Sequence, residues 1–185
     1  MATELTGKRI VLGVCGGIAA YKSAALTSKL AQAGAEVTVL MTESATRFVT
    51  PLTFQALSAR PVYTSPWQHT ESHDPQHINL ARNAYLAIVA PCSMNTLAKL
   101  TAGLCDDVVT LVLSAVDRTR TPVLLAPSMN TEMWNQASTQ RNLAQLKADG
   151  FGFVEPGSGW QACRASGPGR MAEPEDIFSA IAANL

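Results

Sequence analysis

Short apolar runs that end at glycine or proline recur along this chain, and a polar turn and a helical pattern follow each of them. The first run, Arg9–Val14, is broken by Gly16 and Gly17, and residues 18–33 then carry apolar side chains at helical spacing. A β-branched run at 36–41 follows after Gly34. Strand, helix and strand in this order form a right-handed crossover, so we expect a parallel, buried sheet.

The same pattern returns twice, because the apolar runs at 86–90 and 123–126 both lead into a proline and a polar turn. Helices are predicted at 95–102, 106–115, 140–149 and 174–183, and a last short strand at 152–154. The irregular stretch at 63–75 is expected to be a surface loop or flap. We therefore expect one α/β domain over residues 1–185, a Rossmann-like (flavodoxin-like) open parallel sheet with helices on both faces.

Composition narrows the class of partner. The chain has 14 basic and 14 acidic residues and no Lys/Arg cluster, which argues against nucleic acid and against a polybasic membrane contact. No apolar stretch approaches the ~20 residues of a membrane span. The four cysteines form no C-x-x-C pair, so we expect no metal site and expect the thiols to be reduced. We therefore expect a cytoplasmic protein whose partner is a small molecule.

Polar residues gather where the predicted strands end. Residues 91–96 and 127–134 each follow a buried run, and 161–171 form a segment too rich in Gly and Pro for ordinary helix or strand. Ligands of open parallel sheets bind beyond the carboxyl ends of the strands. The three stretches are therefore expected to converge on one pocket.

Several of these residues have a functional and a structural interpretation. Gly16 and Gly17 would let the backbone approach a phosphate or a flat ring, or they form a tight turn without ligand. Thr42 and Ser44 could bind a phosphate, although Ser44 could equally cap the next helix. The stretch from Ser93 to Thr96 has the same ambiguity, since such residues commonly cap helices.

Three further side chains are candidates for chemistry. The Asn130 amide needs a partner, which could be a ligand carboxylate or a backbone group of the adjoining loop. His77 could act as a base or be structural at a helix start. Cys163 is a candidate catalytic thiol whose pKa nearby Arg164 and Arg170 could lower.

Taken together, six stretches carry a family resemblance that extends from about residue 8 to the end of the chain. They read GGIAAYK at 16–22, HINLARNA at 77–84, PCSMNTLAKL at 91–100, GLCDDVVT at 103–110, APSMNTEMW at 126–134 and ACRASGPGRM at 162–171. In this order they resemble the motifs of the homo-oligomeric flavin-containing cysteine decarboxylase family. Within that family the match is best to the branch that acts in coenzyme A biosynthesis.

The resemblance implies roles for particular residues. It implies an FMN held by Gly16, Gly17, Ile18, Thr42, Ser44, Ser93, Met94, Asn95, Thr96 and Met129. It implies that His77 and Cys163 are catalytic and that Asn130, Gln161, Ala162 and Arg164 bind substrate. It also implies a homotrimer, or a dodecamer of trimers, in which the histidine and the flavin meet across a subunit contact.

The implied reaction is that of a carboxy-lyase, the decarboxylation of 4'-phosphopantothenoylcysteine to 4'-phosphopantetheine. The cysteinyl thiol would be oxidised to a thioaldehyde with help from His77, and loss of CO2 would give an enethiolate. Hydride return and a proton from Cys163 would complete the product, so no net oxidation occurs.

Some positions depart from the family pattern and leave alternatives open. Cys92 and Met94 replace alanines, Tyr85 stands where Asp is common, and Arg164 stands where Gly is common, which bears on the shape of the substrate clamp. The alternatives are an oxidative decarboxylase of C-terminal peptidyl cysteine and a non-catalytic flavoprotein regulatory subunit. Because relatives continue into a synthetase domain, the chain is expected to be a stand-alone enzyme or an excised domain.

Overall fold

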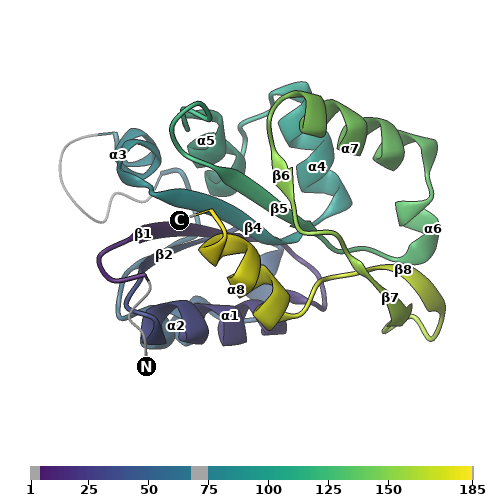
Figure 1. The fold of residues 1–185 in the computed structure, drawn as a ribbon, viewed down its shortest axis with the longest axis horizontal. Coiled ribbons are helices and arrows are strands. Elements are labelled where there is room, and N and C mark those ends of the chain that lie inside the picture. The colour runs from purple at the N-terminus through teal and green to yellow at the C-terminus, as the bar shows by residue number, and fades with distance from the viewer. Residues whose placement is uncertain (1–4, 68–74, 185) are drawn as a thin grey trace.

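The computed structural model describes residues 5–67 and 75–184. Its main sheet has six parallel strands in the order β3-β2-β1-β4-β5-β6 (Figure 1). The strands are β1 (Arg9–Val14), β2 (Glu36–Met41), β3 (Val62–Tyr63), β4 (Leu86–Cys92), β5 (Val123–Pro127) and β6 (Gly152–Phe153). The predicted open parallel sheet is confirmed, and the four long strands lie where the apolar runs placed them.

Helices cover both faces of this sheet, as predicted. On one face lie α1 (Ala20–Gln32), α2 (Pro51–Ser58) and α8 (Pro174–Ala182), and on the other α3 (Gln76–Asn83), α4 (Met94–Ala102), α5 (Val108–Ser114) and α7 (Ala137–Ala148) (Figure 1). The sheet separates two cores, one containing Leu26, Phe54 and Ile177 and the other Leu97, Val109 and Leu146. Alternate strand residues supply both cores, which explains why the strands are apolar throughout.

Two short helical pieces and one strand had no strong sequence signal. A 3-10 turn, η1 (Ala45–Arg47), follows β2, and the one-turn helix α6 (Thr131–Trp134) follows β5. The edge strand β3 has only two residues. Residues 68–74 of the predicted flap at 63–75 lie outside the described residues.

One prediction about local structure is wrong. The segment rich in Gly and Pro around Cys163 contains a strand, because β7 (Gly157–Trp160) and β8 (Ser166–Arg170) pair as an antiparallel hairpin. Pro168 fits because this two-stranded ribbon consists of edge strands only, where a missing N–H is tolerated. Cys163 itself lies in the connecting turn at 161–165, and the hairpin projects from the main sheet beside α6 (Figure 1).

No helix in the described part of the chain combines the length and apolar character needed to cross a membrane.

Candidate functional site

The loops after β1, β4 and β5 lie together at the carboxyl edge of the sheet. The chain proceeds from β1 to one side of the sheet and from β4 to the other, so the crevice between these two strands is a topological switch point. The Cys15 amide donates to Pro91 O at 3.2 Å, and the Ser128 amide donates to Cys92 O at 3.0 Å. Backbone hydrogen bonds thus join the three loops at the place where such folds bind ligands.

The hairpin is held against the loop after β5 by close backbone contact. The Met129 amide donates to Gly169 O at 2.9 Å, and Thr131 Oγ1 donates to Pro168 O at 3.0 Å. A Cβ on Gly169 would lie 2.5 Å from Met129 O, and one on Gly167 would lie 2.5 Å from Thr131 Oγ1. These glycines are therefore required for the hairpin to approach, and they bring its turn to Asn130.

Cys163 and Asn130 meet at the tip of this contact. Asn130 Nδ2 donates to Cys163 Sγ at 3.1 Å, and Cys163 Sγ lies 3.5 Å from Gln161 Oε1. The hydrogen bond from Asn130, followed by a backbone hydrogen bond at Ala165, lowers the pKa of the exposed Cys163 thiol below its ordinary value. Burial instead raises the pKa of Cys15 and Cys92, so of these three thiols Cys163 is the one that ionises most readily.

Asn130 has a second task in the same place. It is the N-cap of α6, and its Oδ1 accepts hydrogen bonds from the amides of Glu132 and Met133 at 2.7 and 3.4 Å. The amide oxygen thus has backbone partners, as the structural alternative required, but they belong to the first turn of α6 and not to the adjoining loop. The amide nitrogen faces the thiol and the cavity.

A cavity of about 520 Å³ opens beside these residues. It is bounded by the start of α1, by the loop after β5 and by the hairpin. Of the predicted site residues, its lining includes Ile18, Met129, Asn130, Gln161, Ala162 and Cys163. Two of the three converging stretches thus line it, whereas residues 91–96 do not and instead support the loop beside it.

The loop after β1 is packed tightly against the turn after β2. A Cβ on Gly16 would lie 2.5 Å from Ser44 Cβ and 2.9 Å from Ser44 C, whereas one on Gly17 would meet open space. Ser44 makes no capping hydrogen bond, so the structural interpretation of its hydroxyl is not realised. Thr42 Oγ1 accepts from the Ala45 amide at 3.3 Å.

The turn after β4 uses its hydroxyls internally. Ser93 caps α4 by accepting from the Thr96 amide at 3.2 Å, and the buried Thr96 Oγ1 lies 3.0 Å from Cys15 Sγ. Met94 and Asn95 occupy the first turn of α4. The capping interpretation therefore holds for Ser93 and Thr96, and a cofactor contact of these four residues remains a prediction.

His77 is not brought to this cavity. It lies at the second position of α3 and lines a small separate hollow with Val108, Leu111 and Val112. In Figure 1, α3 and the hairpin lie at opposite ends of the long axis of the molecule. The two predicted catalytic residues of one chain are therefore far apart.

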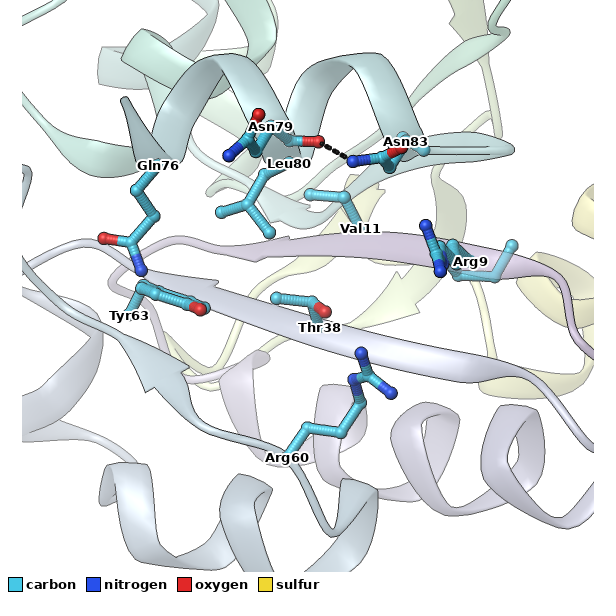
Figure 2. A pocket seen from close by; sticks show the side chains of 11 residues that line it. Arg9, Val11, Thr38, Arg60, Tyr63, Gln76, Asn79, Leu80 and Asn83 are labelled. Atoms are coloured by element: carbon cyan, nitrogen blue, oxygen red, sulfur yellow. Dashed lines mark hydrogen bonds between the residues drawn. The ribbon is translucent and has the colours of Figure 1, made fainter. Parts of the chain in front are cut away.

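A further hollow of about 490 Å³ lies on the sheet between α3 and the β1–β2 edge (Figure 2). Arg9, Arg60 and the amides of Gln76, Asn79 and Asn83 surround it, and Thr38 and Tyr63 lie on its strand side. None of the predicted site residues lines it. Its lining contains neither a cysteine nor a histidine, so the cavity beside Cys163 is the better candidate for thiol chemistry.

The main cavity also contains residues that the sequence did not single out individually. Tyr21 and Lys22 come from the first turn of α1, Ser128 from the loop after β5, and Trp160 from the end of β7. Their spacing from Ile18 on a predicted helix was a usable signal for Tyr21 and Lys22. Predicted Arg164 is exposed and has φ 65°, a left-handed value that explains why glycine is common there.

Comparison with known proteins decides the family. The family model described as Flavoprotein matches residues 1–185. The chain belongs to the flavoprotein family. This confirms the resemblance seen in the motifs and the expected flavin as class of cofactor.

Relatives of this flavoprotein agree in sequence and fold. The coenzyme A biosynthesis bifunctional protein CoaBC of Bacillus subtilis (strain 168) is 48% identical over 94% of the chain, and its Escherichia coli (strain K12) counterpart is 43% identical over 98%. The chain spans only 42% and 44% of these relatives. A cysteine-to-serine mutant of PPC decarboxylase complexed with pantothenoylaminoethenethiol matches with TM-score 0.84 and 34% identity, over 94% of this chain and 96% of that one.

Proposed function

We propose that this chain binds FMN and decarboxylates 4'-phosphopantothenoylcysteine to 4'-phosphopantetheine in coenzyme A biosynthesis. The observation that carries the proposal is the Cys163 thiol, hydrogen-bonded to Asn130 at the rim of the switch-point cavity. The names of the relatives support it, because they concern coenzyme A biosynthesis and a decarboxylase with a thiol-bearing pantothenoyl ligand.

The residues around the cavity fit an FMN. Ile18, Met129 and Trp160 give it apolar walls suited to a flat ring, and its volume lies within the usual range of small-molecule sites. The phosphate of the FMN would lie at the start of α1. The N-cap residue there is Ala19, whose side chain cannot accept hydrogen bonds from the first-turn amides of the helix. These amides, together with the Ser44 hydroxyl, therefore suit a phosphate. We propose that Gly16, Gly17, Thr42 and residues 93–96 complete this site.

The reaction needs an electron sink, because the carbanion left by simple loss of CO2 has nowhere to delocalise. When bound, FMN supplies a reversible two-electron acceptor. The substrate thiol loses two electrons and two protons to become a thioaldehyde, one proton being removed by the His77 imidazole. Carbon dioxide then leaves, and the electron pair of the broken bond forms an enethiolate.

The last step adds a hydride and a proton to the two enethiolate carbons and gives the saturated thiolate, which takes a further proton from solvent to become the thiol. Cys163 supplies the proton, for which its lowered pKa makes it a better donor than an ordinary thiol. Asn130 holds the substrate carboxylate beside the thiol, since an amide nitrogen carries two N–H groups. Gln161, Ala162 and Arg164 form the turn that covers the substrate.

The separation of His77 from Cys163 supports a site shared between subunits. Because α3 and the hairpin lie at opposite ends of one chain, a histidine of a second copy must reach the cavity (Figure 1). We propose a homotrimer, alone or further assembled into a dodecamer. In such an assembly each cavity takes its cysteine from one subunit and its histidine from the next.

The test compares the wild type with Cys163→Ser. Purified protein should show an oxidised flavin spectrum, and phosphopantothenoylcysteine should yield a product lighter by one CO2. The serine variant should release CO2 but give a product lighter by two further hydrogen atoms, because it lacks the proton donor. Mass spectrometry of the products measures both results.

Two outcomes would contradict the proposal. If Cys163→Ser formed the normal reduced product, the Cys163 thiol would not be the proton donor of the last step. Turnover of a peptide ending in cysteine, with no turnover of phosphopantothenoylcysteine, would favour oxidative peptidyl decarboxylation.

A further inference from the structure

A buried lysine lies at the start of α1, directly after the glycine loop. The Lys22 side chain is only 8% exposed, although it carries a charge. Removing a charged group from water is costly unless it is paired. Its Nζ donates to Met171 O at 3.1 Å and to Glu173 Oε1 at 2.9 Å. The ammonium is therefore held by acceptors from one short segment of the chain.

That segment is the base of the Cys163 hairpin. Met171 directly follows β8, and Glu173 is the N-cap residue of α8. Arg170, the last residue of β8, donates to the same Glu173 Oε1 at 2.7 Å. One carboxylate oxygen thus joins a cation of α1 to a cation of the hairpin, and the two hydrogen bonds hold the pKa of Glu173 below its usual range, with Lys22 as the largest cause.

The hydrogen bonds that join Lys22, Glu173 and Arg170 lie at the wall of the cavity beside Cys163. Lys22 and Arg170 both line the cavity beside Cys163. Since Lys22 is six residues from Gly16 in sequence, the helix turn that ends the glycine loop also anchors the hairpin. Opposite this anchor the hairpin is held by the Met129 amide, which donates to Gly169 O at 2.9 Å. The hairpin is therefore fixed on two sides, and only the α1 side depends on a buried charge.

We propose that Lys22 is a positioning residue that fixes the β7–β8 hairpin, and with it Cys163, over the cavity. Its catalytic consequence rests on the function proposed above. Lys22 sets the position of the proton donor relative to the cavity wall formed by the start of α1. Loss of Lys22 leaves the thiol chemistry of Cys163 intact but frees the hairpin to move away. Oxidation and CO2 loss then continue, while the final proton transfer slows.

The experiment uses the intact chain and Lys22→Met, which keeps a flexible apolar stem and removes the ammonium. The matched control is Lys29→Met. Lys29 lies on the same helix and pairs with Glu175 of α8 at 3.0 Å, but both side chains are substantially exposed. Hydrogen exchange of the segment 157–170, followed by mass spectrometry, measures how often the hairpin opens.

We expect exchange in this segment to rise on the order of tenfold in Lys22→Met, as loss of a charge-assisted hydrogen bond predicts. Lys29→Met should leave it unchanged, and β1 and β4 should stay protected in both variants. Glu173→Gln should give a smaller rise, because a neutral amide oxygen can still accept. In the catalytic assay, Lys22→Met should lower kcat more than it changes KM and release more of the unreduced product.

Two results would overturn the proposal. One is unchanged hairpin exchange in Lys22→Met, and the other is an equal rise in β1 and β4, which would mean a general loss of stability. The exchange measurement does not require turnover. If the wild type fails to decarboxylate, the proposed function fails while the positioning role of Lys22 is still decided.

Discussion

Asn130 shows how one side chain combines structure and chemistry. Its oxygen caps α6, and its nitrogen donates to the thiol of Cys163, 33 residues further along the chain. The sequence predicted both residues as site members from their motifs. It could not predict their direct contact, because the contact depends on the hairpin folding back onto the loop after β5.

Replacing Asn130 with Asp separates these two tasks. Asp caps a helix as well as Asn does, so α6 is retained. The donor to Cys163 is lost and a negative charge is placed beside the sulfur, so the pKa of the thiol should rise. The pH midpoint of Cys163 alkylation, measured in a Cys105→Ser background, should therefore move upward.

Asn135→Asp is the control, because it adds the same charge at the other end of α6, where Asn135 is the C-cap. It should leave the midpoint in place. An unchanged midpoint in Asn130→Asp would mean that the amide does not govern the thiol. An equal shift in both variants would mean that the overall charge of this loop, and not the Asn130 amide, governs the pKa of the thiol.

At the scale of elements, hydrophobic runs predicted the positions of the long strands but did not predict the glycine-rich β7–β8 hairpin. The four long strands were recognisable because burial on both faces requires continuous apolar residues. The β7–β8 hairpin was not, since Gly167 and Gly169 serve close contacts with Thr131 and Met129 that no local pattern reveals. The two-residue strand β3 is too short for a periodic signal, whereas the equally short β6 lies within the strand predicted at 152–154.

The glycine loop after β1 offers a matched pair of variants. In Gly16→Ala the new methyl group would lie 2.5 Å from Ser44 Cβ and 2.9 Å from its backbone, so the two loops must separate. We expect a loss of about 1–3 kcal/mol in the free energy of unfolding and less bound flavin per chain. Thermal unfolding and the visible flavin absorbance measure these effects.

Gly17→Ala provides the comparison, because its methyl group would meet open space. Its stability should lie within about 0.5 kcal/mol of the wild type. Equal stability of Gly16→Ala and wild type would show that the loop after β2 moves aside freely. Gly17→Ala also reports on the ligand, since reduced flavin binding without reduced stability would place Gly17 at the cofactor.

For the whole molecule, the sequence predicted the open parallel sheet with helices on both faces, but the positions of its residues alone did not give the distance between His77 and Cys163. Both residues carry family motifs, and motif order along a chain holds no information about which end of the fold each one occupies. The parallel topology places α3 at one end of the sheet and the hairpin at the other (Figure 1).

Mixing two inactive variants tests a shared site. His77→Asn and Cys163→Ser should each fail to form phosphopantetheine. When the two are co-expressed in equal amounts, some cavities combine the intact cysteine of one subunit with the intact histidine of another. Random mixing in a cyclic assembly should restore roughly a quarter of wild-type product formation. No recovery in oligomers shown to contain both variants would contradict a site between subunits.

The two outer strands of the main sheet, β3 and β6, contain two residues each. So short a border offers a neighbouring polypeptide few free backbone groups for strand addition, which limits uncontrolled sheet growth. In the homotrimer proposed above, copies of this chain would therefore recognise one another through side chains on helices and loops, where the geometry of contact can be specific.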